Sequence, residues 1–418
     1  MEYKLNSHLP ANKTVLVVFL LITLGKFGID LGFSLKPYMI FLMLFVIIHV
    51  SAFYFEKLQI FEIALLVFYM TYSFSGAFSL YPSSSLRIIL GISLYLACYF
   101  ILKSILRNSN DSIIERSIAN VGIFFNITSL LLYIAGLKTL SLGSDEGERI
   151  SHLGVMVDRS YPRLIGLLQD PNFFVFYNTI FFAYFLCNAN TLKNRLGLIL
   201  CLVTNLLTFS RGGLLALIII FTIYILLNNL VKQFQILLGL AASLAIIAYI
   251  AIVQLKFDIF GILDSRINDF SNDGGSGRFE LWGRAWDYFS SNVVLGIGAF
   301  NFSDYNSFQY QDTLTVHNTF LDILSESGIL GFSCYLLFIS FVIFQLIESR
   351  VYKKKPYLFL AFIGFVFQMV SLSVIINDIF FMYLAILSIY LTNEKQNRVK
   401  EIESKNDDNM SFTKEVIH

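Results

Sequence analysis

The sequence predicts an all-α protein, a bundle of about twelve membrane-spanning helices with two larger loops outside the membrane. Of its 418 residues, 56% are hydrophobic and only 14% are charged, and the mean hydropathy is +0.69. In a soluble domain about a quarter of the residues are charged. The apolar residues come in runs, and a run of about 18 can cross the hydrocarbon layer as a helix. All six prolines lie in loops or at the ends of these runs, as intact helices require.

The apolar runs divide the chain into regions. We expect spans near residues 14–35, 37–55, 58–78, 86–104, 119–136, 170–187, 196–209, 212–228, 234–254, 318–346, 357–375 and 377–391. The resulting regions are an N-terminal five-span region (1–136), an extracytoplasmic loop (137–169), spans six to nine (170–254), a large extracytoplasmic loop with an interfacial helix (255–317), three C-terminal spans (318–392) and a polar tail, expected to be disordered (393–418).

The distribution of Lys and Arg predicts the orientation of the bundle, because cytoplasmic loops are enriched in both. On the side of the N-terminus these residues gather at Lys103, at Arg107, at 193–195 and at 350–355. We therefore expect both termini in the cytoplasm and the two larger loops on the opposite side. The net charge of +1 excludes an overall nucleic-acid footprint. The four cysteines show neither zinc-site nor disulfide spacing.

The first motif is the segment 161–172, which includes Asp170-Pro-Asn172 at the head of an apolar run. Asp before Pro is typical of a helix start, with Asp170 as N-cap and Pro171 as the first helical residue. That structural role does not explain Arg163, which lies just outside the membrane in the predicted topology. Arg163, Asp170 and Asn172 are therefore candidates for substrate binding.

The second motif is Thr208-Phe-Ser-Arg-Gly-Gly213, between spans seven and eight. Arg211 follows Arg195 by about 24 Å of helix, which puts Arg211 at or slightly below the outer interface. Ser210 can cap the next helix, and the N–H groups of a helix start bind anions. The alternative is an arginine that reaches lipid phosphates. An ionisable group at this depth is nevertheless a functional candidate.

The third motif, residues 277–289, predicts an amphipathic helix at the outer interface. One arc of this helix carries Phe279, Trp282, Trp286 and Phe289, and the opposite arc carries Glu280, Arg284 and Asp287. Arg284 can pair with Glu280 four residues earlier, so a solvated salt bridge explains it. Arg278 falls in the middle of the aromatic arc, where a cation is costly unless an anion meets it. Arg278 is therefore the stronger functional candidate.

The fourth motif, residues 316–331, begins where the chain re-enters the membrane. His317 lies at that point, and the ordinary pKa of histidine, about 6.5, suits proton exchange or anion contact. Asn318 follows it, Glu326 lies about two and a half turns inward, and Gly328 and Gly331 allow close packing. A lone histidine is more often structural, but this one shares the outer side with the arginines of the other motifs. Asn318 and Glu326 are candidates for substrate binding.

A near match to a calcium-binding loop runs from Asp269 to Glu280. Ser271 departs from the pattern, and a Gly-rich turn is the simpler explanation. We expect no metal ion and no cofactor.

Taken in order, the four motifs resemble the O-antigen polymerase/ligase superfamily over about residues 160–335. The resemblance implies a GT-C-like bundle that transfers glycans from undecaprenyl diphosphate on the periplasmic face of the bacterial inner membrane. It also implies that Arg211 is the essential arginine, that Arg278 or alternatively Arg284 is the loop arginine, and that His317 is the late histidine. The Asp-Pro-Asn form of the first motif looks more like polymerases than lipid A-core ligases.

The resemblance implies attack by an acceptor hydroxyl on an anomeric carbon, with a lipid diphosphate leaving. We assign Arg211 and Arg278 to the diphosphate, and Arg163 to diphosphate or glycan. His317 would orient or deprotonate the acceptor, or hold the leaving group. The catalytic candidates are thus Arg211, Arg278 and His317, and the substrate-binding candidates are Arg163, Asp170, Asn172, Ser210, Arg284, Asn318 and Glu326.

The expected partners are a lipid-linked oligosaccharide donor and acceptor, membrane lipids, a chain-length regulator and a flippase. The nearest alternative function is an O-antigen ligase, which transfers the glycan to lipid A-core. An alternative of another class is a flippase for lipid-linked glycans. A flippase would line a path with charges deep in many spans, whereas charge in the middle of the predicted spans is nearly limited to Lys26 and Asp30, an i,i+4 pair.

Overall fold

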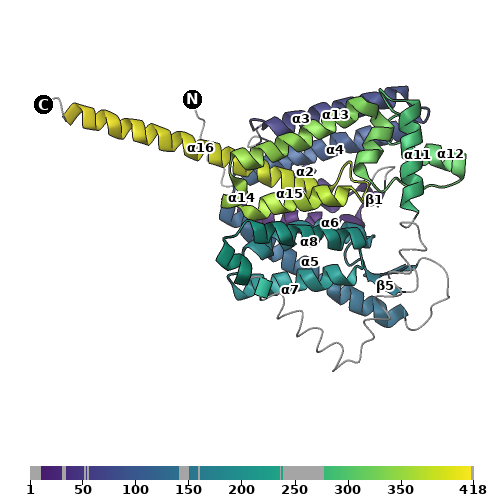
Figure 1. Ribbon diagram of the computed structural model, residues 1–418, viewed down its shortest axis with the longest axis horizontal. Coiled ribbons are helices and arrows are strands. Elements are labelled where there is room, and N and C mark those ends of the chain that lie inside the picture. Colours follow the sequence, from purple (N-terminus) through teal and green to yellow (C-terminus); the bar gives the residue numbers. More distant parts are fainter. Residues whose placement is uncertain are drawn as a thin grey trace.

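The computed structural model describes residues 11–30, 34–50, 53, 56–140, 150–158, 161–235, 237–238 and 277–415. Within these residues the protein is mostly helical, as predicted. The long helices lie side by side, with α11, α12 and short strands at one end of the bundle and α14 at the other (Figure 1). We call the first of these the strand end and the second the α14 end.

The helices of the described residues are α1 (Ala11–Ile22), α2 (Pro37–Ile48), α3 (Ile60–Ser75), α4 (Pro82–Arg107), α5 (Asp111–Leu140), α6 (Pro171–Cys187), α7 (Leu192–Leu207), α8 (Arg211–Leu226), α11 (Arg278–Ser291), α12 (Phe302–Tyr310), α13 (Thr319–Glu348), α14 (Val351–Lys354), α15 (Pro356–Met369) and α16 (Asp378–Glu415). Five short strands correct the all-α prediction. The first two, β1 (Ile29–Asp30) and β2 (Ser34–Leu35), form an antiparallel hairpin, and β3 (Ile150–His152), β4 (Val155–Asp158) and β5 (Tyr161–Leu164) form an antiparallel sheet in that order.

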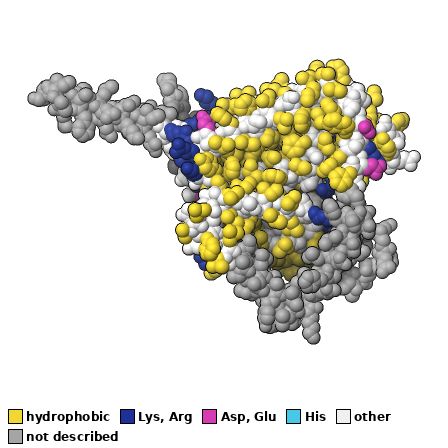
Figure 2. Space-filling view, in the orientation of Figure 1, with side chains coloured by type: hydrophobic (Ala, Val, Ile, Leu, Met, Phe, Trp, Pro, Cys, Tyr) yellow, Lys and Arg dark blue, Asp and Glu magenta, His cyan; other side chains and the backbone are white. Residues whose placement is uncertain are grey.

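Four helical segments of the described residues are long and apolar enough to cross a membrane, namely Ile60–Phe78, Pro82–Arg107, Asp111–Thr139 and Thr319–Glu348. Shorter apolar helices accompany them at Lys13–Ile22, Pro37–Ile48, Pro171–Cys187, Arg211–Leu226 and Pro356–Met369. Hydrophobic side chains cover the middle of the face shown in Figure 2, while Lys and Arg gather at the end where α16 leaves the bundle. These features indicate a membrane protein. The predicted span 234–254 lies almost wholly outside the described residues, so the count of twelve stays a prediction.

The first predicted span, 14–35, is shorter than expected. Its helix α1 ends at Ile22, after which Gly25–Phe27 form a 3-10 turn and the chain enters the β1–β2 hairpin. A side chain at Gly25 would lie 3.2 Å from a carboxylate oxygen of Asp378, so the chain turns where a glycine permits a close approach. Lys26 donates to the Leu153 carbonyl oxygen at 3.2 Å. Lys26 and Asp30 therefore share no helical face, so the predicted helical i,i+4 arrangement is not formed.

Buried ion pairs lie near the ends of the predicted spans. Lys36 contacts Asp378 at 2.5 Å, and the Asp378 side chain is fully buried. Lys103 contacts both carboxylate oxygens of Glu62, at 2.7 and 2.8 Å, and both side chains are buried. Each charge has an opposite charge beside it, as burial requires. These pairs join helices to one another.

The central helix is α6, which is buried along almost its whole length and packs against α15, α7 and α8. Its Asn178 exchanges hydrogen bonds with Asn126 of α5, at 2.9 and 3.0 Å, and donates to Asn205 of α7 at 3.0 Å. Such polar contacts join helices in a membrane, where apolar packing alone gives little specificity. These contacts hold the middle of α6 against α5 and α7.

The polar tail 393–418 was expected to be disordered. In the structure α16 continues as helix through Glu415 and projects away from the bundle (Figure 1). Backbone hydrogen bonds within the helix do not require an apolar face, so a polar composition alone does not exclude helix.

Candidate functional site

The motifs predicted from sequence lie at the strand end of the bundle. The α7–α8 turn, the start of α6, α11 and the start of α13 all face this end (Figure 1). The Lys353–Lys355 cluster lies at the α14 end, beside the start of α15. The helices therefore bring together four segments that are far apart in the sequence.

The start of α8 is fixed to the start of α6. Ser210 is the N-cap of α8, as predicted, and its hydroxyl accepts from the Gly213 amide at 3.2 Å. The same hydroxyl donates to Oδ1 of Asn172 at 2.7 Å. A Cβ at Gly213 would lie 2.8 Å from Val175, so glycine allows α8 to approach α6 closely. Arg211 is the first residue of α8 and is exposed.

The start of α6 confirms the predicted cap. Asp170 accepts hydrogen bonds from the amides of Asn172 at 2.7 Å and Phe173 at 3.2 Å. Nearby, Arg163 on β5 donates through Nε to the carbonyl oxygen of Thr208 at 2.9 Å, at the end of α7. The structure thus joins Arg163, Asp170, Asn172, Ser210 and Arg211 in what we call the α6–α8 cluster. Two helix N-termini meet there, and each adds partial positive charge.

His317 precedes α13 in a left-handed conformation, with φ of 54°. Asn318 caps α13 by accepting from the amides of Phe320 at 3.0 Å and Leu321 at 3.2 Å. Thr319 donates to the Leu372 carbonyl oxygen at 2.6 Å and accepts from the Val374 amide at 2.9 Å. The cap explains why Asn318 follows the histidine.

The segment 371–374 connects the α6–α8 cluster to the His317 region. A Cβ at Gly212 would lie 2.5 Å from the Ser371 hydroxyl oxygen, so this segment packs against the start of α8. Thr319 holds the same segment against the start of α13. Arg211 and His317 therefore belong to helix starts that flank one short segment.

Helix α11 packs against the re-entry point. Trp282 donates through Nε1 to the carbonyl oxygen of Val316, the residue before His317, at 3.2 Å. Arg278 lies one turn before Trp282 on the same side of α11. The predicted helix is confirmed, but its buried face consists of Leu281, Ala285 and Tyr288, while Phe279 and Trp286 are exposed. The α11 start, with Arg278, thus belongs to the same end of the bundle as His317.

Arg284 is occupied by the protein itself. It pairs with Glu280, as predicted, and also contacts Asp312 at 3.0 Å and Asn306 at 2.6 Å. The Tyr310 ring lies 4.0 Å from its guanidinium carbon. Burial alone would raise the pKa of Asp312. Hydrogen bonds from a backbone amide, from Asn306 and from Arg284 outweigh burial and hold this pKa below its ordinary value. Arg284 therefore anchors α12 to α11.

Glu326 lies deeper and binds protein groups. Its carboxylate accepts from the Tyr72 hydroxyl and, at 3.1 Å, from the amide of Phe302 at the start of α12. It is 3% exposed. The structure thus gives Glu326 a role in fixing α12 against α3 and α13, and does not bring it into the α6–α8 cluster.

Gly328 interrupts α13, with φ of 62° and ψ of −163°. The loop 293–298 enters this break: Ile297 donates to the Ser325 carbonyl oxygen at 2.9 Å, and Ile329 donates to the Val293 carbonyl oxygen at 2.8 Å. A Cβ at Gly328 would lie 2.4 Å from the Val294 carbonyl carbon. The predicted close packing at this glycine is confirmed. The break itself was not predicted, because a glycine in an apolar run is compatible with a continuous helix.

Sequence analysis did not single out Asp322 or Ser373, which face a cavity beside the start of α13. Asp322 could have been noticed because it lies four residues before Glu326, on the same helical face. Ser373 carries no local signal. The near match to a calcium loop, from Asp269, lies almost wholly outside the described residues.

Residues 196–336 match the family model described as O-antigen ligase. This range contains Ser210, Arg211, Arg278, Arg284, His317, Asn318 and Glu326 and begins after Arg163, Asp170 and Asn172. The chain is also 25% identical over 247 residues to the teichuronic acid biosynthesis protein TuaE of Bacillus subtilis (strain 168). The alignment covers 53% of this chain and 50% of that relative, so the match spans about half of the relative's length.

Members of the matched family are glycan-transferring enzymes of the ligase and polymerase type, and lipid-linked glycans are the corresponding substrate class. The resemblance that the four motifs predicted is confirmed over residues 196–336, which match this family model.

Proposed function

We propose that this protein polymerises lipid-linked oligosaccharide repeat units. It would transfer the growing glycan from a polyprenyl diphosphate carrier to a hydroxyl of the next lipid-linked unit. The observation that carries this proposal is the α6–α8 cluster, in which Arg211 begins a helix that Ser210 ties to Asn172 at 2.7 Å, beside Arg163.

The cluster has the chemistry that a diphosphate leaving group needs. A guanidinium binds phosphate oxygens in a fork and stays charged at all working pH values. Two converging helix N-termini add partial positive charge that is fixed in place before the reaction. Groups held in position in this way stabilise charge as it develops. Arg211 and Arg278 would bind the diphosphate, and Arg163 would bind the diphosphate or the adjoining glycan.

The reaction that fits these groups is a single displacement with inversion. The acceptor hydroxyl oxygen forms a bond to the anomeric carbon as the bond from that carbon to the diphosphate oxygen breaks. His317 would orient or deprotonate the acceptor, or hold the leaving group, and an imidazole suits each role near neutral pH. Arginines and helix starts supply the positive charge, so the reaction would need no metal ion.

The distribution of charge supports an active site outside the cytoplasm. Lys353, Lys354 and Lys355 lie at the α14 end, opposite the α6–α8 cluster. Lys and Arg mark the cytoplasmic side of membrane helices. The protein would then lie in the bacterial inner membrane with both termini inside and the cluster facing the periplasm. A flippase would supply its substrates there, and a chain-length regulator would accompany it.

The nearest alternative is a ligase that uses lipid A-core as acceptor. Purified full-length protein in lipid nanodiscs would receive lipid-diphosphate repeat units, with and without lipid A-core, in a buffer containing EDTA. A polymerase produces a ladder of longer lipid-linked glycans without lipid A-core. Transfer only in the presence of lipid A-core would establish the ligase, and absence of both products would overturn the proposal.

A further inference from the structure

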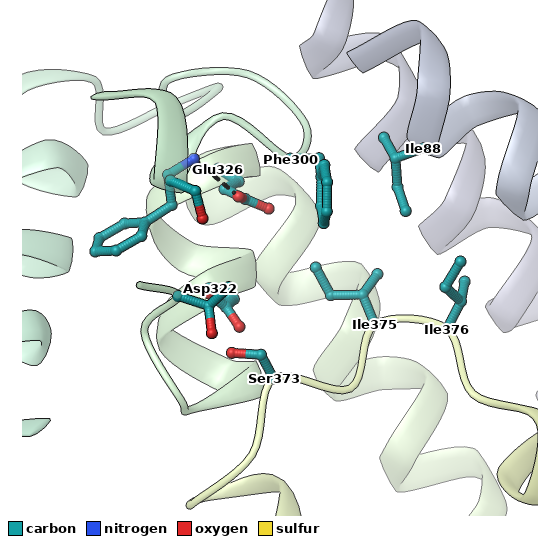
Figure 3. A pocket seen from close by; sticks show the side chains of 10 residues that line it. Ile88, Phe300, Asp322, Glu326, Ser373, Ile375 and Ile376 are labelled. Atoms are coloured by element: carbon teal, nitrogen blue, oxygen red, sulfur yellow. Dashed lines mark hydrogen bonds between the residues drawn. The ribbon is translucent and has the colours of Figure 1, made fainter. Parts of the chain in front are cut away.

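A cavity with one polar and one apolar wall lies between the start of α13, α4 and the segment 372–376 (Figure 3). The polar wall contains Ser303, Thr315, Asp322, Glu326 and Ser373, and the apolar wall contains Ile88, Phe300, Ile375 and Ile376. The cavity shares Ile88, Phe300 and Ile376 with a second cavity, lined by Lys36 and Arg87 among others. The two cavities are therefore adjacent.

Two groups of the polar wall lack hydrogen-bond partners among the described residues. These are Oδ2 of Asp322, a residue only 4% exposed, and the hydroxyl of Ser373. Figure 3 shows the two side chains turned toward one another at the same part of the cavity. A buried carboxylate oxygen without a donor costs folding free energy, because the water it has lost is not replaced. A ligand that donates hydrogen bonds would remove that cost.

The remaining parts of the polar wall are held rigidly. Thr319 bonds to the backbone on both sides of Ser373, at Leu372 and Val374, with distances of 2.6 and 2.9 Å. Glu326 already accepts from Tyr72 and from the Phe302 amide. Glu326 therefore shapes the cavity, and Asp322 is the carboxylate that is available to a ligand.

We infer that this cavity binds an uncharged sugar ring of the acceptor glycan, with Asp322 accepting a hydrogen bond from a sugar hydroxyl and Ser373 making a second contact. A sugar ring carries hydroxyl donors at its edge and C–H groups on its faces, which match the polar and apolar walls. The inference rests on the proposed function. It adds where the acceptor glycan binds and that the bound sugar is uncharged.

Two other ligand classes fit less well. Among the described residues, the lining of this cavity contains no Lys or Arg to balance the charge of a uronic acid or a phosphate, and burying an unpaired charge is costly. Calcium takes six to eight oxygen ligands and magnesium six, including several carboxylates or waters. Of the two carboxylates in this cavity, Glu326 already accepts hydrogen bonds from protein donors. The cavity therefore selects a neutral ligand with hydroxyl groups.

The cavity is close to the proposed proton acceptor. Thr315 lines it two residues before His317, and Asp322 lines it from the first turn of α13, the helix that begins two residues after His317. A sugar held at Asp322 would therefore place one of its hydroxyls, or that of the next ring, near His317.

The first test is ligand binding in the absence of turnover. Saturation-transfer NMR would use the full-length protein in nanodiscs with methyl glucoside, methyl N-acetylglucosaminide and methyl glucuronide. We expect a signal from at least one neutral glycoside, and at least a tenfold weaker affinity for it in Asp322→Asn and Ser373→Ala. Asp287→Asn, an exposed carboxylate on α11, is the matched control and should bind as wild type does. Equal binding by all variants, or binding of the glucuronide alone, would overturn the inference.

The second test separates a ligand site from a structural role. Because the Asp322 oxygen lacks a partner, Asp322→Asn should retain or raise the melting temperature while the KM for the acceptor rises about tenfold. A clear fall in melting temperature, or an unchanged KM, would contradict the inference. Glycoside binding that depends on Asp322 in a protein without transferase activity would refute the proposed function and leave this site standing.

Discussion

Replacing Gly328 by alanine should disrupt the end of the bundle that carries the candidate site. Gly328 has φ of 62° and ψ of −163°, a region that is essentially restricted to glycine. The added Cβ would lie 2.4 Å from the Val294 carbonyl carbon and oxygen. Neither the backbone at this residue nor the loop 293–298 can remain where it is.

The magnitude follows from the contacts at the break. Ile297, Gly298 and Ile329 donate backbone hydrogen bonds of 2.9, 3.0 and 2.8 Å across it. Each contributes about 1 kcal/mol, and the backbone strain of a non-glycine residue adds about 1–3 kcal/mol. Partial relaxation of the loop reduces the sum, so we expect a loss of about 2–5 kcal/mol in the free energy of unfolding.

The assay is thermal unfolding of the purified protein in detergent, followed by circular dichroism and by protease resistance of the 293–298 loop. The matched control is Gly283→Ala in α11, where a Cβ meets nothing within 4 Å. Alanine there improves helix propensity by about 1 kcal/mol, so the control should be as stable as wild type or slightly more stable. If Gly328→Ala unfolds at the wild-type temperature with an equally protected loop, the assigned break in α13 is wrong.

Three further predictions concern the helix starts and the charged groups. Ser210→Ala should lower the free energy of unfolding by about 0.5–2 kcal/mol and reduce glycan transfer. The control Thr191→Ala removes the N-cap of α7 at the opposite end and should lower stability by a similar amount while transfer stays unchanged. Equal transfer activities of the two variants would disprove the role of the α8 start. The pKa of Asp312 is lowered in the fold, so its stabilisation is present above about pH 4 and disappears as the pH falls through the folded value. Hydrogen exchange of α12 should therefore accelerate at low pH in the wild type, and Asp312→Asn should abolish that pH dependence. Lys36→Met leaves Asp378 buried without its cation and should lower the free energy of unfolding by about 3–5 kcal/mol, measured as a lower melting temperature. An unchanged melting temperature would show that the pair does not stabilise the fold.

Local signals in the sequence predicted the helix starts of the site. Asp170, Ser210 and Asn318 are short polar residues at the heads of apolar runs, and each caps a helix in the structure. The pair of Glu280 and Arg284 was likewise predictable, because residues four apart meet on one helix face. Such contacts depend only on spacing along the chain.

Contacts between distant segments could not be predicted in this way. Lys36 and Asp378 lie more than three hundred residues apart in the chain, yet they form a buried pair. Ser373 faces Asp322 only because Thr319 holds the loop before α16 against α13. No spacing rule connects these residues, since their proximity results from how the helices pack.

The first predicted span fails for a different reason. Hydropathy treated 14–35 as one run, but Gly25 allows the chain to turn against Asp378 and the hairpin follows. A glycine in an apolar run signals either continuation or a turn, and only packing decides between them.

The most direct test of the account compares Arg211→Ala with Arg195→Ala. Arg195 is an exposed arginine near the start of α7, at the opposite end of the neighbouring helix, and donates to the Ala189 carbonyl oxygen at 2.9 Å. Purified wild type and both variants would be given lipid-diphosphate repeat units, and chain growth would be followed by gel electrophoresis. Loss of one preorganised charge donor costs about a hundredfold or more in rate, so Arg211→Ala should form almost no polymer while Arg195→Ala matches wild type. Equal chain growth by Arg211→Ala and wild type would contradict the assignment of the α6–α8 cluster as the diphosphate site.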